Sequence, residues 1–192
     1  KMKIVAGAII GFILIGPIVF SQYKYEASDE FPYGLPNPEA PEQLKDFEPM
    51  IGSCNCKSTT RKQDGTWNSP ESMTWTWKYI LNGNAVQDET LKSDGAHSGS
   101  IRQYDEKKQE WNVHYYSTGA ITSPLQTWKG NRKNNKIVLY KKQNAPNGAK
   151  GFSRLTFYDI SNKGYKWIGE WVDEKETVSF PFWKIECVKT NK

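Results

Sequence analysis

Residues 73–81 read MTWTWKYIL, and their pattern is the clearest indication of the fold in this chain. Apolar and aromatic side chains occupy every second position, and threonine or lysine fills most of the positions between them. Side chains on a β-strand alternate between the two faces of a sheet, so the pattern predicts a strand with one buried and one wetted face. A strand of this kind is typical of an antiparallel sheet around an apolar interior.

The same alternation continues on both sides of this strand. Segments rich in Trp, Tyr and Thr fill residues 52–189, and turn signals such as Asn82-Gly83-Asn84 separate them. A run of sequential hairpins of this length predicts an all-β, antiparallel up-and-down β-barrel. We expect about ten strands, at residues 52–62, 71–82, 85–93, 98–105, 109–117, 123–130, 135–142, 152–160, 164–173 and 176–189.

The N-terminal region has the pattern of an export signal. Lys1 and Lys3 precede an uncharged apolar stretch over residues 4–20, and Ser21 follows it. This arrangement predicts a secretory signal peptide over residues 1–21, with a retained membrane anchor as the alternative. The protein is therefore expected to be exported, either periplasmic or secreted, and to be membrane-anchored if the apolar stretch is retained.

The rest of the chain is expected to be one domain with a lead segment. Residues 22–40 are polar and contain several prolines, which predicts an extended linker. Residues 41–192 then form a single barrel domain. Pro41 begins a segment in which Leu44 and Phe47 share a face, so we expect a short amphipathic helix that closes one mouth of the barrel.

The charge pattern excludes some classes of partner. The formal net charge is +5, and removal of residues 1–21 would take away two lysines and no acid, leaving 5 − 2 = +3. The basic residues are spread singly or in pairs, whereas a nucleic-acid partner requires a concentrated basic face. We expect no nucleic-acid partner, and contact with a membrane only through an uncleaved N-terminus.

The three cysteines predict a cross-link between the ends of the barrel. Cys54 and Cys56 share a face of the first strand, and Cys187 lies near the end of the last strand. These two ends lie side by side in a closed meander with an even number of strands. We expect a disulfide between Cys187 and either Cys54 or Cys56 in an oxidising compartment. The cysteine spacing and the two distant histidines match no zinc pattern, so no metal site is expected.

The hairpin after the first quoted strand carries a family resemblance. Residues 75–88 read WTWKYILNGNAVQD, and SIRQYD at residues 100–105 and Trp111 follow. These motifs resemble an uncharacterised bacterial family of lipocalin-like, calycin-type barrels with a Trp-rich strand, a Gly-x-Ala-x-Gln-Asp hairpin and an Arg-x-Tyr-Asp strand. The resemblance covers residues 42–189 and implies a calycin-type barrel without an assigned activity. Related barrels begin with Gly-x-Trp, whereas this chain has Cys54 at the position of that Trp.

Strand phase selects the residues that would line the interior. Aromatic walls with one cation favour a small apolar or aromatic molecule that carries a polar or anionic head. An inward Arg102 requires a partner, which Asp88 or Glu89 can supply. The expected function is therefore that of an exported barrel that binds such a ligand without transforming it. The candidate ligand-binding residues are Trp75, Trp77, Tyr79, Gln87, Asp88, Arg102, Tyr104 and Trp111.

Three alternatives stay open. The tryptophans can fill the barrel completely, which would leave an envelope interaction protein with an aromatic patch at Phe180, Phe182 and Trp183. Tyr, Arg and carboxylate groups can perform acid–base chemistry in a barrel, which would make the protein an isomerase or lyase. Some related barrels ligate haem through a His, but no His occurs in the last strands here. We predict no catalytic residue and no cofactor.

Overall fold

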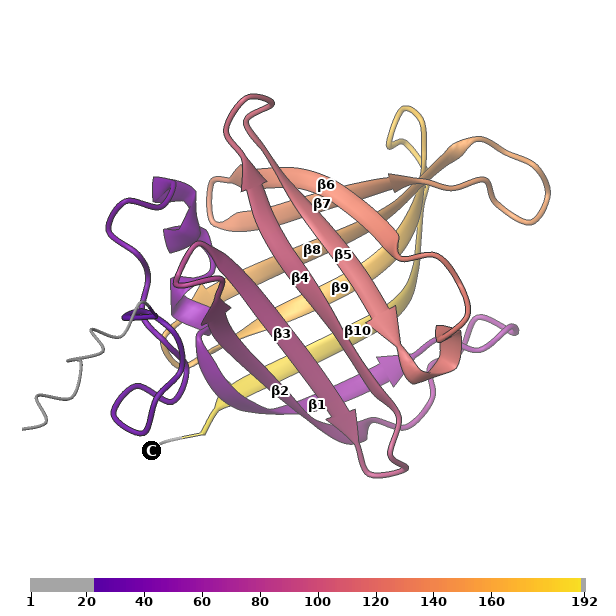
Figure 1. Ribbon diagram of the computed structural model, residues 1–192. Coiled ribbons are helices and arrows are strands. Elements are labelled where there is room, and N and C mark those ends of the chain that lie inside the picture. The colour runs from indigo at the N-terminus through magenta and orange to yellow at the C-terminus, as the bar shows by residue number, and fades with distance from the viewer. Residues whose placement is uncertain (1–22, 191–192) are drawn as a thin grey trace, which may run out of the picture.

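The chain forms a closed antiparallel barrel of ten strands, which confirms the predicted fold class. We describe residues 23–190 of the computed structural model (Figure 1). The predicted export segment lies outside these residues. The strands are β1 (Gly52–Thr60), β2 (Glu71–Ile80), β3 (Ala85–Lys92), β4 (His97–Asp105), β5 (Glu110–Ser117), β6 (Gln126–Lys133), β7 (Lys136–Lys142), β8 (Gly151–Ser161), β9 (Gly164–Asp173) and β10 (Ser179–Lys189).

Each strand pairs with its neighbour in the sequence, and β1 pairs with β10 to close the barrel. Nine of the ten predicted strands differ from the observed ones by only a few residues at their ends. The largest shift concerns β6, which was expected at residues 123–130. Pro124 cannot donate a backbone hydrogen bond to a sheet. The segment 118–125 instead forms a short 3₁₀ helix, η3 (Thr118–Ala120), and a loop.

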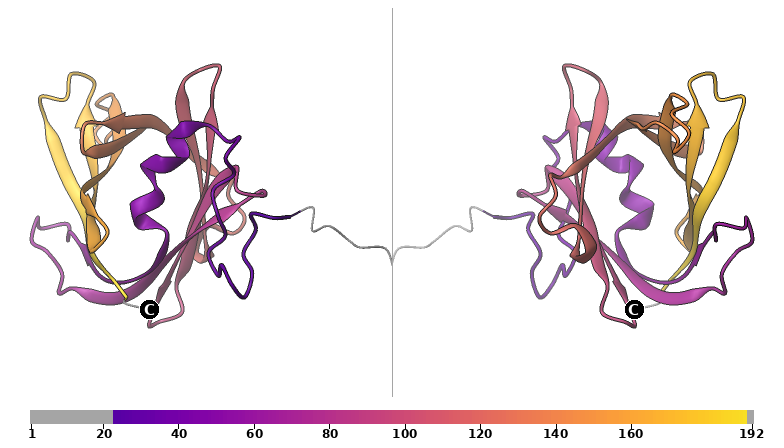
Figure 2. Two further views of the ribbon diagram at one scale, coloured as in Figure 1. Left: turned by 90° about the vertical axis from the view of Figure 1, so that its left-hand side faces the viewer. Right: turned by 90° about the vertical axis from the view of Figure 1, so that its right-hand side faces the viewer.

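Two 3₁₀ helices close one end of the barrel, where a short amphipathic helix was expected. They are η1 (Glu42–Asp46) and η2 (Glu48–Met50). Their buried side chains Leu44, Phe47 and Met50 are spaced by three residues, which matches the three residues per turn of a 3₁₀ helix. Figure 2 shows this helical segment lying across the end of the ring of strands. Phe47 stacks 5.7 Å from Trp77 on β2, so the helices seal this end with aromatic contacts.

The segment expected to be an extended linker forms a series of turns over residues 23–40, beside the closed end of the barrel. The backbone of Tyr79 donates a 2.9 Å hydrogen bond to the carbonyl of Tyr33, and Asn37 donates one of 3.0 Å to Gly83 in the β2–β3 turn. Gly83 has a φ of +77°, and a Cβ there would lie 2.5 Å from the backbone nitrogen of Asn37. Glycine at this turn therefore allows the lead segment to approach the barrel closely. Residues 23–40 are held against the hairpin by these bonds.

The seam between β1 and β10 carries the cross-link. Cys56 lies opposite Cys187 in the register, and the two form a disulfide. Cys54 lies on the same inner face of β1 as Cys56 and is a buried free thiol. It is opposite Lys189 in the register. The structure thus pairs Cys187 with Cys56, one of the two partners that the sequence left open.

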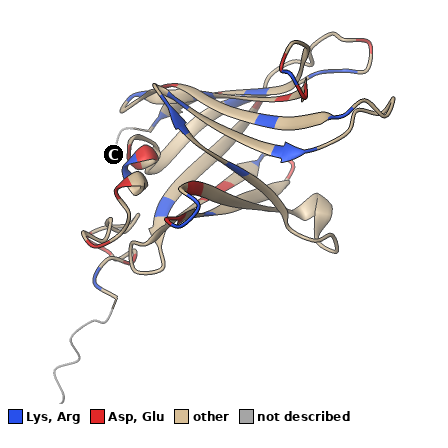
Figure 3. Ribbon diagram, turned by 90° about the horizontal axis from the view of Figure 1, so that it is seen from above, with Lys and Arg blue, Asp and Glu red and all other residues tan. Residues whose placement is uncertain are grey.

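The outer surface carries charges of both signs. In the view of Figure 3, the positions of Lys and Arg and those of Asp and Glu are both scattered over the strands and loops. Among residues 23–190, no helix has the length and apolar character needed to cross a membrane.

Candidate functional site

A cavity of about 310 Å³ lies inside the barrel. Its floor is formed by Trp75, Arg102 and Phe157, which cover the aromatic cluster around Phe47 at the closed end. Its rim includes the exposed Gln143, after the end of β7, at the opposite end of the barrel. The volume is at the lower end of the range for small-molecule sites. The barrel is therefore filled at one end and hollow toward the other.

A buried ion pair forms the polar part of the floor. Asp88 on β3 pairs with Arg102 on β4, and both side chains are only 3% exposed. The second oxygen of Asp88 accepts a 2.7 Å hydrogen bond from the indole N–H of Trp75 on β2. Three neighbouring strands thus contribute to one charge-assisted network.

Aromatic rings surround the guanidinium of Arg102. Its central carbon lies 4.3 Å from the ring centre of Trp77, 5.2 Å from that of Phe47 and 5.8 Å from that of Phe157. Cation–π attraction stabilises a cation in such a setting. The Nε atom is buried and has no hydrogen-bond partner among residues 23–190. A buried donor without a partner is costly, so the contact with Asp88 and the surrounding rings must offset this cost.

One wall of the cavity, formed by β3 and β4, is polar. Besides the ion pair, it presents Thr90, Ser98 and Ser100. The hydroxyls of Thr90 and Ser98 are 2.6 Å apart and share a hydrogen bond. Ser100 is buried beside Asp88 in the register, and its hydroxyl has no hydrogen bond to another described residue. Hydroxyl groups therefore run from the floor toward the mouth along this wall.

The wall formed by β8, β9 and β10 is mostly aromatic and aliphatic. The rings of Trp167 and Trp183 meet edge to face at 5.2 Å. The indole N–H of Trp183 donates to Ser58 at 2.8 Å, so the polar atom of this ring is satisfied by the protein. Ser153 is the one polar lining residue on these three strands, and it accepts a 3.1 Å hydrogen bond from the indole of Trp128. The other lining residues of this wall are Leu155, Phe157, Phe182 and Ile185.

The fifth and sixth strands complete the ring of lining residues. Val113 and Tyr115 on β5 and Trp128 on β6 line the side between the two walls. Tyr115 and Trp128 meet edge to face at 6.2 Å. These rings extend the apolar surface around the cavity.

A bulge in β10 brings two consecutive aromatic residues to the cavity. The register of β10 against β9 shifts between Pro181 and Trp183, and Phe182 occupies the extra position. In a regular strand, neighbouring side chains would point to opposite faces. Gly169 leaves space here, because a Cβ at this position would lie 3.1 Å from the ring of Phe182.

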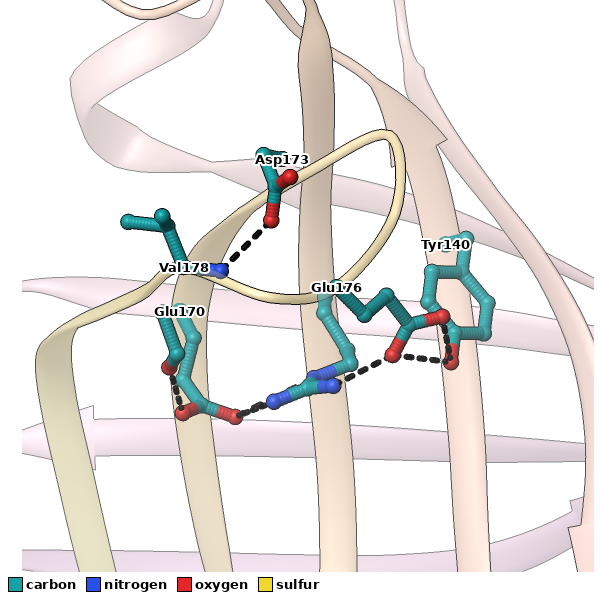
Figure 4. A network of polar contacts seen from close by, with 7 residues as sticks. Tyr140, Glu170, Asp173, Glu176 and Val178 are labelled. Carbon is teal, nitrogen blue, oxygen red and sulfur yellow. Dashed lines mark hydrogen bonds and ion pairs between the residues drawn. The ribbon is translucent and has the colours of Figure 1, made fainter.

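A polar network on the outer surface fixes the β9–β10 turn beside this bulge (Figure 4). Arg154 on β8 donates to Glu170 on β9 at 3.0 Å and to Glu176 in the turn at 2.5 Å. Tyr140 donates to Glu176 at 3.1 Å, and Asp173 accepts a 2.6 Å bond from the backbone of Val178. The burial of Tyr140 and its contact with Glu176 raise the pKa of its hydroxyl, because both disfavour the phenolate. The turn is tied to the barrel wall.

The structure brings three of the eight predicted binding residues to the cavity: Trp75, Asp88 and Arg102. Their role in binding remains a prediction. Gln87 lies in the opposite phase of β3, where its amide donates a 2.9 Å hydrogen bond to the hydroxyl of Tyr116. It does not line the cavity.

The other four predicted residues lie at the closed end, outside the cavity lining. Trp77 donates a 2.7 Å hydrogen bond to Tyr165, and Trp111 donates one of 3.0 Å to Asp46 of η1. Tyr104 packs edge to face on Trp111 at 5.4 Å. Burial, followed by the charge of Glu48, raises the pKa of Tyr79 to about 12. The helices of the closed end cover these rings, which strand phase alone could not show.

Sequence reasoning missed the hydroxyl wall and most of the aromatic wall. Thr90, Ser98 and Ser100 share the phase of Asp88 and Arg102, so alternation on β3 and β4 could have selected them. Phe182 and Trp183 were considered as an exposed patch. Trp183 lines the cavity because it shares the inward phase of Ile185, and Phe182 lines it because the bulge adds one position to β10.

The remaining reactive groups give no metal site. Burial raises the pKa of the Cys54 thiol and raises the pKa of its neighbour Tyr165 well above the usual value. His97 is exposed, and Nδ1 of His114 lies 2.9 Å from the hydroxyl of Thr127. Within the described part of the chain, no three His, Cys, Asp or Glu side chains gather in a way that could hold a metal ion.

Comparison with known proteins supports the fold alone. No family model matches the chain, and no curated protein does either. Among solved structures, the crystal structure of Rv2717c from M. tuberculosis is similar, with a TM-score of 0.52 and 9% sequence identity. The match covers 80% of this chain and 100% of that one. At this identity, the likeness concerns the architecture of the barrel.

Proposed function

We propose that this protein is an exported, lipocalin-like barrel that binds a small, partly apolar molecule in its lumen without transforming it. The observation that carries the proposal is the cavity of about 310 Å³, which is closed at one end and bordered by four indole rings. A barrel that needed its aromatic residues only as core would pack them to native density. Here Trp75, Trp128, Trp167 and Trp183 border empty volume.

The floor of the cavity supports a specific orientation of the ligand. Arg102 and Asp88 line the end of the cavity farthest from the rim, and beside them Ser100 keeps a hydroxyl without a hydrogen bond to another described residue. A ligand that reaches the floor would place a polar atom there, because it can hydrogen-bond to this hydroxyl. The aromatic wall would hold the apolar part of the molecule.

Two features support a location outside the cytoplasm. The apolar stretch at residues 4–20 follows two lysines, as in a signal peptide or an anchor. The disulfide between Cys56 and Cys187 is of the kind that persists in oxidising compartments. We propose a periplasmic or secreted protein, held at a membrane if the apolar stretch is retained.

An interaction role is the second candidate, and the exposed apolar side chains favour it. Ile121 and Leu125 in the β5–β6 loop are 81% and 59% exposed, and Val178 in the β9–β10 turn is 55% exposed. These loops lie at the end of the barrel opposite to η1 and η2. Exposed apolar groups of this kind mark contact surfaces when they form a continuous patch.

Isothermal titration of the purified protein with 2-naphthol tests the lumen as a binding site. Leu155 lines the cavity, whereas Leu91 on β3 is 51% exposed on the outer face. The Leu155→Trp variant fills the cavity, and the Leu91→Trp variant is its matched control. We expect saturable binding to the wild type and to the control variant, and none to Leu155→Trp. Equal binding to all three proteins would contradict a site in the lumen.

A further inference from the structure

We infer that the cavity selects a neutral, flat ring molecule with oxygen substituents along one edge, and that it discriminates against carboxylates. This inference rests on the proposed function of the lumen and names the class of its ligand. It follows from the distribution of polar groups around the cavity, from their free hydrogen-bonding capacity and from the charge of the floor.

The polar and apolar linings face each other across the barrel. In the ring of ten strands, β3 and β8 are five places apart, and so are β4 and β9. All five lining residues on β3 and β4 are polar or charged. On β8, β9 and β10, six of seven are apolar, and the exception, Ser153, already accepts the hydrogen bond from Trp128. A molecule in this cavity therefore contacts hydroxyl and charged groups along one edge and mostly aromatic side chains along the other.

The polar wall has unused hydrogen-bonding capacity along its length. Near the floor, Ser100 offers a hydroxyl without a hydrogen bond to another described residue. Toward the mouth, the Thr90 and Ser98 hydroxyls share one hydrogen bond, and Thr90 also donates to the backbone carbonyl of Ser98 at 3.3 Å. Their unused lone pairs can still accept a hydrogen bond from a ligand hydroxyl. Groups at several depths suit a molecule with several oxygen atoms, because a molecule with one terminal head would leave most of them unpaired.

The floor offers no excess positive charge to a carboxylate. Asp88 compensates Arg102 directly, and both are buried. An anion placed on this floor would lie near the Asp88 carboxylate, and like charges that share a buried site repel each other. A neutral hydroxyl can hydrogen-bond to Ser100 beside the pair without this repulsion. The ion pair thus acts as a dipolar hydrogen-bonding surface.

The opposite wall favours a flat shape. Phe157, Trp167 and Trp183 present rigid rings, and aromatic rings gain additional stabilisation from contact with other rings. A rigid planar ligand also loses less conformational entropy on binding than a flexible acyl chain does. The expected class is therefore a hydroxylated or carbonyl-bearing aromatic compound.

Three probes that share one ring system test this inference. They are naphthalene-2,3-diol, naphthalene-2-carboxylate and naphthalene, each titrated at pH 7 into the purified protein and followed by calorimetry. We expect the diol to bind at least about tenfold more tightly than the carboxylate, since one unfavourable charge contact of about 1.4 kcal/mol has this effect. Dodecanoate, which is anionic and flexible, should bind more weakly than the diol.

A variant pair localises the preference to the polar wall. Ser100→Ala removes one hydroxyl from the cavity, and we expect it to weaken binding of the diol about threefold to tenfold. Its affinity for naphthalene should stay within about twofold of the wild type, because naphthalene forms no hydrogen bond with the wall. Ser72 lies exposed on β2, outside the cavity lining, and Ser72→Ala is the matched control.

The outcomes separate this inference from the proposed function. If the carboxylate or dodecanoate binds as tightly as the diol, and Leu155→Trp abolishes that binding, the lumen is a binding site and the inferred ligand class is wrong. If Ser100→Ala weakens the diol and naphthalene equally, the polar wall does not select the ligand and the inference fails. If none of the four probes binds to the wild type, the proposed function fails together with the inference.

Discussion

Asp88 and Arg102 form an ion pair inside the barrel, and both side chains are only 3% exposed. The pair forms the floor of a cavity in which the walls differ in polarity, and Trp75 ties it to a third strand through its indole N–H. Such a buried pair is costly unless both charges are compensated. It connects the stability of the barrel with the chemistry of the site.

Breaking this pair should destabilise the protein strongly. Arg102→Met leaves the Asp88 carboxylate buried with only the indole of Trp75, and removal of one partner of a buried pair costs about 3–5 kcal/mol. The double variant Asp88→Leu/Arg102→Met should lose less than Arg102→Met alone, because no unpaired charge remains. Urea unfolding measures these free energies.

An exposed pair provides the control for that series. Lys166 and Asp159 lie 3.0 Å apart, with side chains 43% and 62% exposed. Lys166→Met should cost much less than Arg102→Met, because solvent screens an exposed ion pair. A cost for Arg102→Met as small as that of Lys166→Met would mean that the interior pair does not hold the floor together.

Tryptophans at the two ends of the barrel should differ in their contribution to stability. Trp77 is fully buried under Phe47 and donates to Tyr165, so Trp77→Ala should cost about 3–5 kcal/mol. Trp183 is half-buried and borders the cavity, so Trp183→Ala should cost less. Thermal and urea unfolding of both variants measure the difference. A larger loss of unfolding free energy in Trp183→Ala than in Trp77→Ala would contradict a tightly packed core at the end closed by η1 and η2.

The disulfide should join Cys56 to Cys187 and leave Cys54 free. We expect a peptide map of the non-reduced protein to contain the Cys56–Cys187 link, and iodoacetamide to modify Cys54 only after unfolding. Burial excludes the reagent and raises the pKa of this thiol, which disfavours the reactive thiolate. Loss of the link in Cys187→Ser should cost about 2–5 kcal/mol. A link between Cys54 and Cys187 would contradict the register of β1 and β10.

The pH dependence of stability should report the raised pKa of the Asp46 carboxyl in the folded protein. Burial raises its pKa above 3.8 in the folded protein, although Trp111 and Arg132 act in the opposite direction. Its contribution to stability is therefore fully present below pH 3.8 and is lost as the pH rises through the folded pKa. The free energy of unfolding of the wild type minus that of Asp46→Asn should become more positive as the pH falls from 7 toward 3.8.

The exposed carboxyl of Asp64 provides the opposite sign. Hydrogen bonds from Thr66 lower its pKa below 3.8, so its contribution to stability is present above that pH and is lost as the pH falls through the folded pKa. The free energy of unfolding of the wild type minus that of Asp64→Asn should therefore decrease as the pH falls. Unfolding titrations of the three proteins between pH 3 and 7 compare the two slopes, and slopes of equal sign would refute the assignment for Asp46.

Alternation in sequence predicted the strands because it is a local property of each segment. The strand of Trp75 and Trp77 shows how far this reasoning extends. Both side chains point inward, as predicted, yet Trp75 borders the cavity and Trp77 lies beneath its floor. Trp77 is covered because η1 and η2 insert Phe47 into this end of the barrel, and Trp75 lies beyond their reach. Contacts between segments far apart in the sequence determine how far the helices insert, so alternation along one strand does not reveal it.

The β10 bulge shows a second limit of sequence reasoning. Phe182 falls in the outward phase of a regular strand, and only the shift between Pro181 and Trp183 brings it to the lumen. The Asp88–Arg102 pair, in contrast, was predictable as one of two options, because an inward arginine needs a carboxylate and only adjacent strands can supply one.

Native mass spectrometry of the protein purified from its own host, followed by denaturation and identification of any released small molecule, tests directly whether the lumen holds a ligand. We expect the wild type and Leu91→Trp each to carry a stoichiometric compound that is uncharged, aromatic and oxygenated, and Leu155→Trp to carry none. Wild-type protein that is free of small molecules in repeated preparations, or a compound retained equally by Leu155→Trp, would contradict a ligand-binding lumen.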